Sequence, residues 1–210
     1  GRMAGNSIRS VGKYVYDRGI LPKTTLTVET ASGVHTLTLY TRDGAVTLCG
    51  VTMGRADFAA ASLPALTDKV ELVNAPIEVG GKTYTVTCLS VGNPHCVVFD
   101  DRIDALDLEV LGPQFEHAPL FPERINTEFV RVVNRNMLKM RVYERGNGET
   151  PACGTGACAA VAAAVRLGLC AADEDVTVKV RGGDLVVRVS AEGITLTGET
   201  GLVFEGVVYA

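Results

Sequence analysis

The sequence predicts a mixed α/β (α+β) protein that contains two copies of one structural unit. A run of Ala and Val from Ala157 to Val165, closed by Gly168, predicts a helix, because alanine is the best helix former and glycine commonly ends helices. Alternating stretches joined by Gly-containing turns predict β-hairpins. Four pairs of glycines are separated by the same 149 positions, namely 5 and 154, 19 and 168, 33 and 182, and 44 and 193. A constant offset across these elements indicates an internal repeat.

The elements follow in a simple order along the chain. Ile8, Val11 and Val15 recur at helical spacing and Gly19 ends that helix, after which strands are expected at 25–30, 34–40 and 45–53. The middle of the chain predicts strands at 84–90, 128–133 and 138–143 and a short helix at 112–118. Asn93-Pro94-His95 is typical of a turn. The second copy then repeats the pattern, with the helix at 157–165 and strands at 176–180, 185–189 and 194–198.

The repeat suggests two domains. We expect a first domain at 1–52, which a final strand at 201–209 could join so that 199–210 belong to it, and a second domain at 53–198. Within the repeat, Ala4 occupies the position of Cys153, and Gly5-Asn6 occupy the positions of Gly154-Thr155. We therefore expect the two helix N-termini to face one cleft and hold one anionic ligand between them, with Ala4 Cβ opposite Cys153 Sγ.

Composition limits the range of functions. The 210 residues carry a net charge of −4 and no basic cluster, which argues against a nucleic-acid partner. No apolar run is long enough to cross a membrane, and no signal peptide is present, so we expect a cytoplasmic protein. The six cysteines lack zinc-type spacing, so we expect free thiols and no metal.

Cys153 is the first candidate for chemistry. It directly precedes Gly154-Thr155-Gly156 at the start of the predicted helix, where free amides form an anion pocket and the helix dipole lowers the pKa of a thiol. On that basis, Cys153 should be the cysteine that alkylating reagents modify first. A structural, buried cysteine is the competing interpretation. Further polar candidates stand at strand ends, where ligands are often bound: Asn93, His95, Asn126, Glu144 and Arg145.

Four segments carry a resemblance to a known family. GNPHCVVF, FPERINTEFV, ERGNGETPACGTGACAA and MAGNSIRSVGKYVYDRG resemble the signature segments of diaminopimelate epimerase, in the same order and over nearly the whole chain. The resemblance implies two pseudo-symmetric domains, each a β-barrel-like sheet around a central helix. It also implies cofactor-independent epimerisation of LL- to meso-diaminopimelate, a step in lysine and peptidoglycan precursor biosynthesis. Two cysteines would act on opposite faces of the α-carbon of this amino-acid substrate, and the enzyme would be a homodimer.

The resemblance also implies roles for individual residues. Cys153 matches one catalytic thiol, and His95 and Glu144 match residues that assist proton transfer beside the thiols. The positions matching the substrate-binding set are Gly5, Asn6, Asn93, Asn126, Glu144, Arg145, Gly154 and Thr155.

The chain departs from the family pattern at three points. Ala4 replaces the partner cysteine, Ser10 replaces the cysteine that follows Arg9, and the opening strands of the usual N-terminal domain are missing. Inversion needs an acid or base on each face of the carbon, so we expect impaired epimerisation.

Three other functions remain open on the sequence. A racemase of histidine or proline would use the same fold with a different side-chain pocket. A Cys–His hydrolase would pair Cys153 as nucleophile with His95 as base. A non-catalytic ligand-binding relative would account for Ala4.

Overall fold

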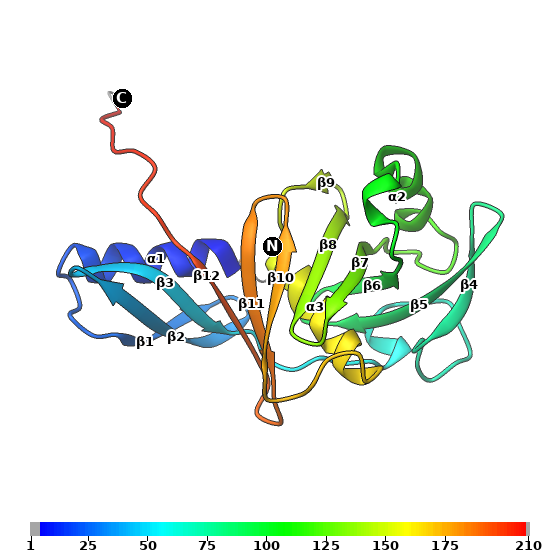
Figure 1. The fold of residues 1–210 in the computed structure, drawn as a ribbon, viewed down its shortest axis with the longest axis horizontal. Helices are drawn as coiled ribbons and strands as arrows, with labels where there is room; N and C mark the ends of the chain where they lie inside the picture. Colours follow the sequence, from blue (N-terminus) through cyan, green and yellow to red (C-terminus); the bar gives the residue numbers. More distant parts are fainter. Residues whose placement is uncertain (1–4, 209–210) are drawn as a thin grey trace.

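The computed structural model describes residues 5–208, and every structural statement below refers to that part of the chain. Figure 1 shows an elongated molecule with α1 at one end, α2 and β4 at the other, and α3 between them. The helices and strands are α1 (Gly5–Asp17), β1 (Thr25–Thr30), β2 (Gly33–Arg42), β3 (Ala45–Thr52), β4 (Ala75–Val79), β5 (Lys82–Ser90), β6 (Pro94–Phe99), α2 (Leu108–Glu116), β7 (Asn126–Asn134), β8 (Met137–Glu144), β9 (Gly148–Thr150), α3 (Gly154–Arg166), β10 (Asp175–Val180), β11 (Gly183–Val189) and β12 (Ile194–Glu199).

The described strands form one continuous sheet. Its order is β1-β2-β3-β12-β11-β10-β8-β7-β6-β5-β4, with β9 added beside β8. The predicted repeats are each a helix followed by a three-stranded meander, and their third strands, β3 and β12, pair antiparallel and join the two meanders. Strands β6 and β7 run parallel, as do β8 and β10. Since the sheet runs through both repeats, the domain boundaries at 52 and 198 stay a prediction.

The sheet curves around α3 and buries it. Residues 155–164 of this helix are all buried, in one core with the facing side chains of β5 to β8 and β10 to β12. Alanine dominates α3 because small side chains let strands approach from several sides. A second core lies on the other face of the sheet under α2, where Phe115 packs edge-on against Tyr84 and Phe129, with centroid distances of 4.9 and 5.5 Å. The fold is therefore mixed α/β with a strongly curved sheet around a central helix, as expected.

The two repeats agree closely in their backbones. Helices α1 and α3 have 13 residues each and begin 149 positions apart. Gly19 and Gly168 end them in the left-handed region, and their amides donate to the carbonyls of Tyr16 and Val165. The hairpin glycines differ from the expected match, because Gly33 corresponds to Gly183 rather than to Gly182; the φ angles of these two are 118° and 134°. The reason is one extra residue between α3 and β10.

Three other expectations are corrected. No strand forms at 201–208, and these residues are exposed (Figure 1). Strand β12 ends at Glu199, and both of its edges are already paired, one with β11 and the other with β3. The short helix begins earlier than predicted, at Leu108, because the Asp107 side chain accepts a hydrogen bond from the Glu109 amide and so caps it. Pro94 does not lie in a turn but opens β6. No helix in residues 5–208 is long and apolar enough to span a membrane.

Candidate active site

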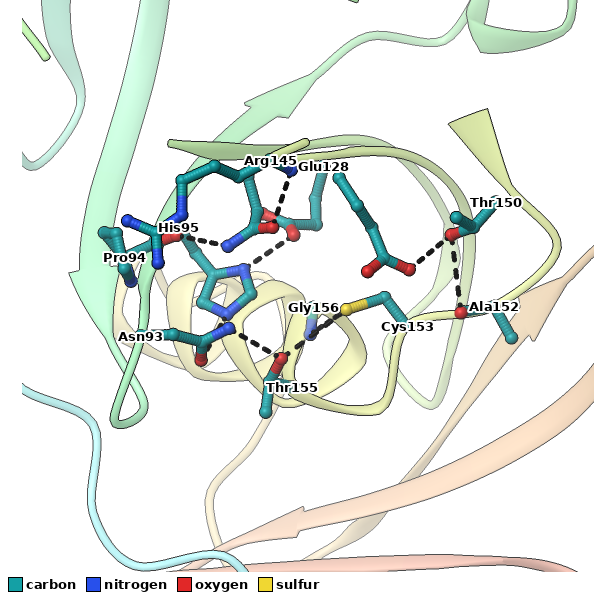
Figure 2. Close-up of polar contacts among 12 residues, drawn as sticks. Asn93, Pro94, His95, Glu128, Arg145, Thr150, Ala152, Cys153, Thr155 and Gly156 are labelled. Atoms are coloured by element: carbon teal, nitrogen blue, oxygen red, sulfur yellow. Dashed lines mark hydrogen bonds and ion pairs between the residues drawn. The ribbon is translucent and has the colours of Figure 1, made fainter. Parts of the chain in front are cut away.

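The start of α3 places Cys153 at the N-cap position. Its backbone is extended, with φ −136° and ψ 114°, and its Sγ accepts a hydrogen bond from the Gly156 amide at 3.3 Å. Thr155 Oγ1 lies 3.5 Å from the same sulfur. Figure 2 shows the Cys153 side chain turned towards Gly156 and Thr155, above the first turn of the helix. The predicted meeting of a thiol with free helix amides is therefore present.

The predicted effect on the thiol is wrong in sign. Burial is the main cause and the nearby carboxylates of Glu128 and Glu144 the second; together they raise the pKa of Cys153 to about 12, although the contacts of Thr155 and Gly156 lower it. A thiolate in this site would lose its hydration next to two negative charges, a cost that exceeds the benefit of one helix end. Cys153 is thus a thiol at neutral pH. All six cysteines are free and buried, so preferential alkylation of Cys153 no longer has a lowered pKa as its reason and stays a prediction.

Strand alternation gathers the polar residues on the α3 side of the sheet. His95 in β6 lies opposite Asn126 in β7, and Glu128 follows two positions later on the same face. The same alternation directs Val97 and Val130 into the core around α3. Consequently, the neighbouring strands β6 and β7 carry polar side chains towards the start of one helix.

A chain of hydrogen bonds runs from β7 to the thiol (Figure 2). Glu128 Oε1 lies 2.7 Å from His95 Nδ1, and both side chains are fully buried. His95 Nε2 lies 3.0 Å from Asn93 Oδ1, and Asn93 Nδ2 donates to Thr155 Oγ1 at 3.2 Å. Thr155 completes the chain to Cys153 Sγ. His95 therefore acts on the thiol only through Asn93 and Thr155 in this geometry.

Asn126, Glu144 and Arg145 form the second half of the polar group. The Asn126 side chain donates to the Pro94 carbonyl at 2.8 Å and accepts from the Arg145 amide at 3.0 Å, so it ties the ends of β6 and β8 together. The Arg145 guanidinium donates outward to the Glu123 carbonyl at 3.2 Å. Glu144 accepts from Thr150 Oγ1 in the segment that leads into Cys153.

Glu128 is the site residue that the sequence interpretation missed. The sequence predicts a strand at 128–133 that begins at this residue and gives it no role, although an acidic residue two positions after Asn126 shares its face in any strand. An ideal Cβ at Gly156 would lie 2.7 Å from Glu128 Oε1, so glycine at that position is what lets the carboxylate approach the helix start. The usable signal was a charge at an inward-facing position.

The starts of the two repeat helices lie close together. An ideal Cβ at Gly5 would be 3.3 Å from Leu196 Cδ2, and one at Gly154 would be 2.9 Å from the same atom. Two of the predicted ligand-binding positions thus meet at one side chain of β12. Ala4 lies outside the described residues, so its predicted placement opposite Cys153 remains a prediction, as does the contribution of the Asn6 side chain.

Two kinds of chemistry receive no support from the described residues. Within 5–208, no group of three or more His, Cys, Asp or Glu side chains could hold a metal ion. The Cys–His hydrolase would need the imidazole beside the sulfur, but both His95 nitrogens face other partners, Glu128 and Asn93. That pairing is not assembled here.

The fold is that of a class of racemases and epimerases. Over the whole chain it matches the crystal structure of a probable proline racemase from Agrobacterium radiobacter with a TM-score of 0.71, at 17% identity and covering 68% of that chain. It matches a hydroxyproline epimerase from Agrobacterium vitis with a TM-score of 0.68, at 16% identity, over 94% of this chain and 64% of the other.

Sequence similarity then narrows the class to one family. The family model described as diaminopimelate epimerase matches residues 87–203. The diaminopimelate epimerase of Acetivibrio thermocellus is 47% identical over 208 residues, which are 98% of this chain and 74% of that protein. That of Methanococcus maripaludis is 42% identical over 206 residues, with 97% and 74% covered. The chain belongs to the diaminopimelate epimerase family and is an epimerase-like isomerase.

Proposed function

We propose that this chain binds diaminopimelate and carries one functional half of a two-thiol epimerisation site. The observation that carries the proposal is Cys153 at the N-cap of α3, with the Gly156 amide donating to its sulfur and Glu144 nearby. The names of the most similar relatives support the choice of substrate. The free amides of Gly154 and Thr155 are suited to hold a substrate α-carboxylate, because a helix N-terminus attracts anions.

The chemistry follows from the state of the thiol. The thiol first loses its proton to solvent, and the resulting thiolate acts as the base: the α-C–H bond breaks, an S–H bond forms and an α-carbanion remains. After the S–H proton exchanges with solvent, Cys153 acts as the acid and returns a proton to the same face, so that a C–H bond forms again and the thiolate is regenerated. Because its pKa is raised to about 12, Cys153 rests as the acid, and proton abstraction by it is slow at neutral pH. Helix amides that face the carboxylate would stabilise the carbanion without a metal.

Ala4 sets the limit on turnover. Alanine has no ionisable group, so the opposite face of the α-carbon receives no proton from that position, and inversion is impaired. A site with one working face should exchange the α-hydrogen of a bound isomer without inverting it. This exchange without inversion is the distinguishing property of the proposed half-site.

Incubation in deuterium oxide with LL- and meso-diaminopimelate tests the proposal. We expect deuterium at the α-carbon of one stereocentre, little interconversion, and a loss of exchange of about 100- to 10,000-fold in Cys153→Ser. Cys170→Ser, a buried cysteine after the end of α3, serves as the control and should retain exchange. Rapid interconversion would contradict the half-site, and exchange that survives in Cys153→Ser would contradict the role of the thiol.

The same experiment separates the remaining alternatives. Exchange with proline or histidine but not with diaminopimelate would indicate a racemase of another amino acid, the activity named for the fold neighbours in the case of proline. Calorimetric binding of diaminopimelate without any exchange would indicate a non-catalytic ligand-binding relative.

A further inference from the structure

Glu128 is a carboxylate fully buried behind His95, and the chemistry proposed above does not use it. Its Oε1 contacts His95 Nδ1 at 2.7 Å, while Oε2 has no hydrogen-bond partner among the described residues. Burying a carboxylate is costly unless it is paired. Because Oε2 is unpartnered, only the contact with His95 offsets the cost of burying this carboxylate.

The hydrogen bonds fix the number of protons on this pair. Asn93 Nδ2 donates to Thr155, so the Asn93 carbonyl oxygen is the atom that faces His95 Nε2. A carbonyl oxygen only accepts, hence Nε2 carries a proton. Nδ1 and Glu128 Oε1 then share a second proton in order to bond each other, so the pair is neutral overall.

The same directions continue to the thiol. Thr155 Oγ1 accepts from Asn93, which leaves its own proton to donate towards Cys153 Sγ at 3.5 Å. The sulfur then faces two donors, the Thr155 hydroxyl and the Gly156 amide. Two donors stabilise the sulfur when it becomes negative. If His95 lost one proton, the Asn93 amide would turn over, and Thr155 would accept from the thiol instead.

We propose that Glu128 is a positioning residue: it holds His95 as an imidazolium and thereby directs the hydrogen bonds of Asn93 and Thr155 towards the sulfur of Cys153. The Asn93 amide transmits only orientation, since its N–H bonds do not break. The proton exchanged with substrate remains that of Cys153. The proposal deepens the proposed function and rests on it for its catalytic meaning, but the hydrogen-bond directions can be tested without turnover.

Nitrogen-15 NMR of the histidine rings tests the first step in the wild-type chain. His35→Gln and His117→Gln assign the signals by elimination. We expect both His95 ring nitrogens to be protonated at neutral pH, one of them to lose its proton in Glu128→Gln, and Glu128→Asp to restore the doubly protonated ring. An unprotonated His95 nitrogen in the wild type would overturn the proposal even if the Gln variant failed to fold.

The rate of Cys153 alkylation, followed by mass spectrometry at one pH, tests the second step. If Glu128 acts through the hydrogen-bond chain, Glu128→Gln removes one donor from the sulfur and slows alkylation about two- to tenfold. If Glu128 acted only as a negative neighbour, its removal would speed alkylation, because its charge raises the pKa of Cys153. Faster alkylation would therefore refute the chain.

Thr127→Val is the matched control, since Thr127 is a buried neighbour in β7 on the opposite face of the strand. It should change neither the His95 spectrum nor the alkylation rate. If both readouts behave as expected while neither diaminopimelate isomer exchanges hydrogen, the positioning role stands and the proposed function fails. If hydrogen exchange occurs but His95 is singly protonated, the proposed function stands and the positioning role of Glu128 fails.

Discussion

Helices α1 and α3 occupy equivalent places in the two repeats but lie in different surroundings. Residues 155–164 of α3 are buried, whereas Val11 and Tyr14 of α1 are 45% and 59% exposed. Each helix packs on its own meander, but β5 to β8 cover α3 on a further side. Figure 1 shows α1 lying along β1 to β3 and α3 enclosed among strands. One unit therefore forms an enclosed site only where additional strands complete the layer around its helix.

The same strands account for the difference in chemistry. Strands β6, β7 and β8 supply His95, Glu128 and Glu144 around the start of α3. The backbone, by contrast, is close to symmetric: Cys49 of β3 pairs directly with Gly198 of β12, and these are equivalent positions 149 residues apart. An antiparallel pairing centred on equivalent residues relates the repeats by an approximate two-fold axis. A symmetric backbone thus carries a site whose polar groups come from one side.

The largest expected effect tests the enclosure of α3. Ala160→Leu adds volume inside a filled core and should lower the free energy of unfolding by about 1–3 kcal/mol or more. Val11→Leu, at the equivalent position of α1, should change it by less than about 0.5 kcal/mol because Val11 is half exposed. Urea unfolding of both variants measures the difference. Similar effects in the two helices would show that α1 and α3 are equally enclosed.

The next effect concerns the dependence of stability on pH. The pKa of Cys153 is raised from an ordinary value of 9.0 to about 12, so the folded chain keeps this thiol protonated while the unfolded chain ionises it. That contribution to stability is complete below pH 9 and is lost as pH rises towards 12. Between these values it should lower the free energy of unfolding by up to about 1.4 kcal/mol per pH unit.

The Cys153→Ser variant lacks the pH-dependent contribution of this thiol, so its free energy of unfolding should fall less steeply with pH than that of the wild type. Urea unfolding from pH 8 to 10.5 under reducing conditions gives both curves. Parallel curves would mean that Cys153 ionises equally in the folded and unfolded chains.

The smallest effect tests the close approach at the start of α3. A Cβ at Gly156 would lie 2.7 Å from Glu128 Oε1 and 3.2 Å from Cys153 Cβ. Overpacking should cost more than the roughly 1 kcal/mol of helix propensity that alanine adds, leaving a net loss of about 1 kcal/mol in Gly156→Ala. Ser7→Ala, at the equivalent exposed position of α1, should be nearly neutral or stabilising. A stabilising Gly156→Ala would mean that Glu128 has room to move.

The sequence alone was sufficient for the repeat and for most strands, and it predicted a thiol at the start of a helix. Alternating polarity and turn glycines predicted the hairpins. A strand with one buried face needs alternating side chains, and a turn with a left-handed backbone favours glycine, so both signals are local in the sequence. Gly19 and Gly168 marked the ends of both helices correctly for that reason. The family segments gave the fold and identified Cys153, Asn93, His95 and Glu144 as candidates.

Only the tertiary structure decided the state of the thiol and the partners of His95. The helix end was visible in sequence, but the carboxylates that face Cys153 come from β7 and β8, which are distant in the chain and adjacent only through sheet pairing. The same holds for Glu128, whose meaning depends on the parallel register of β6 and β7 and on the absence of a side chain at Gly156. Local sequence preferences determine where helices and strands form. The burial and the electrostatic environment of a site depend on all neighbouring side chains, which only the packed sheet brings together.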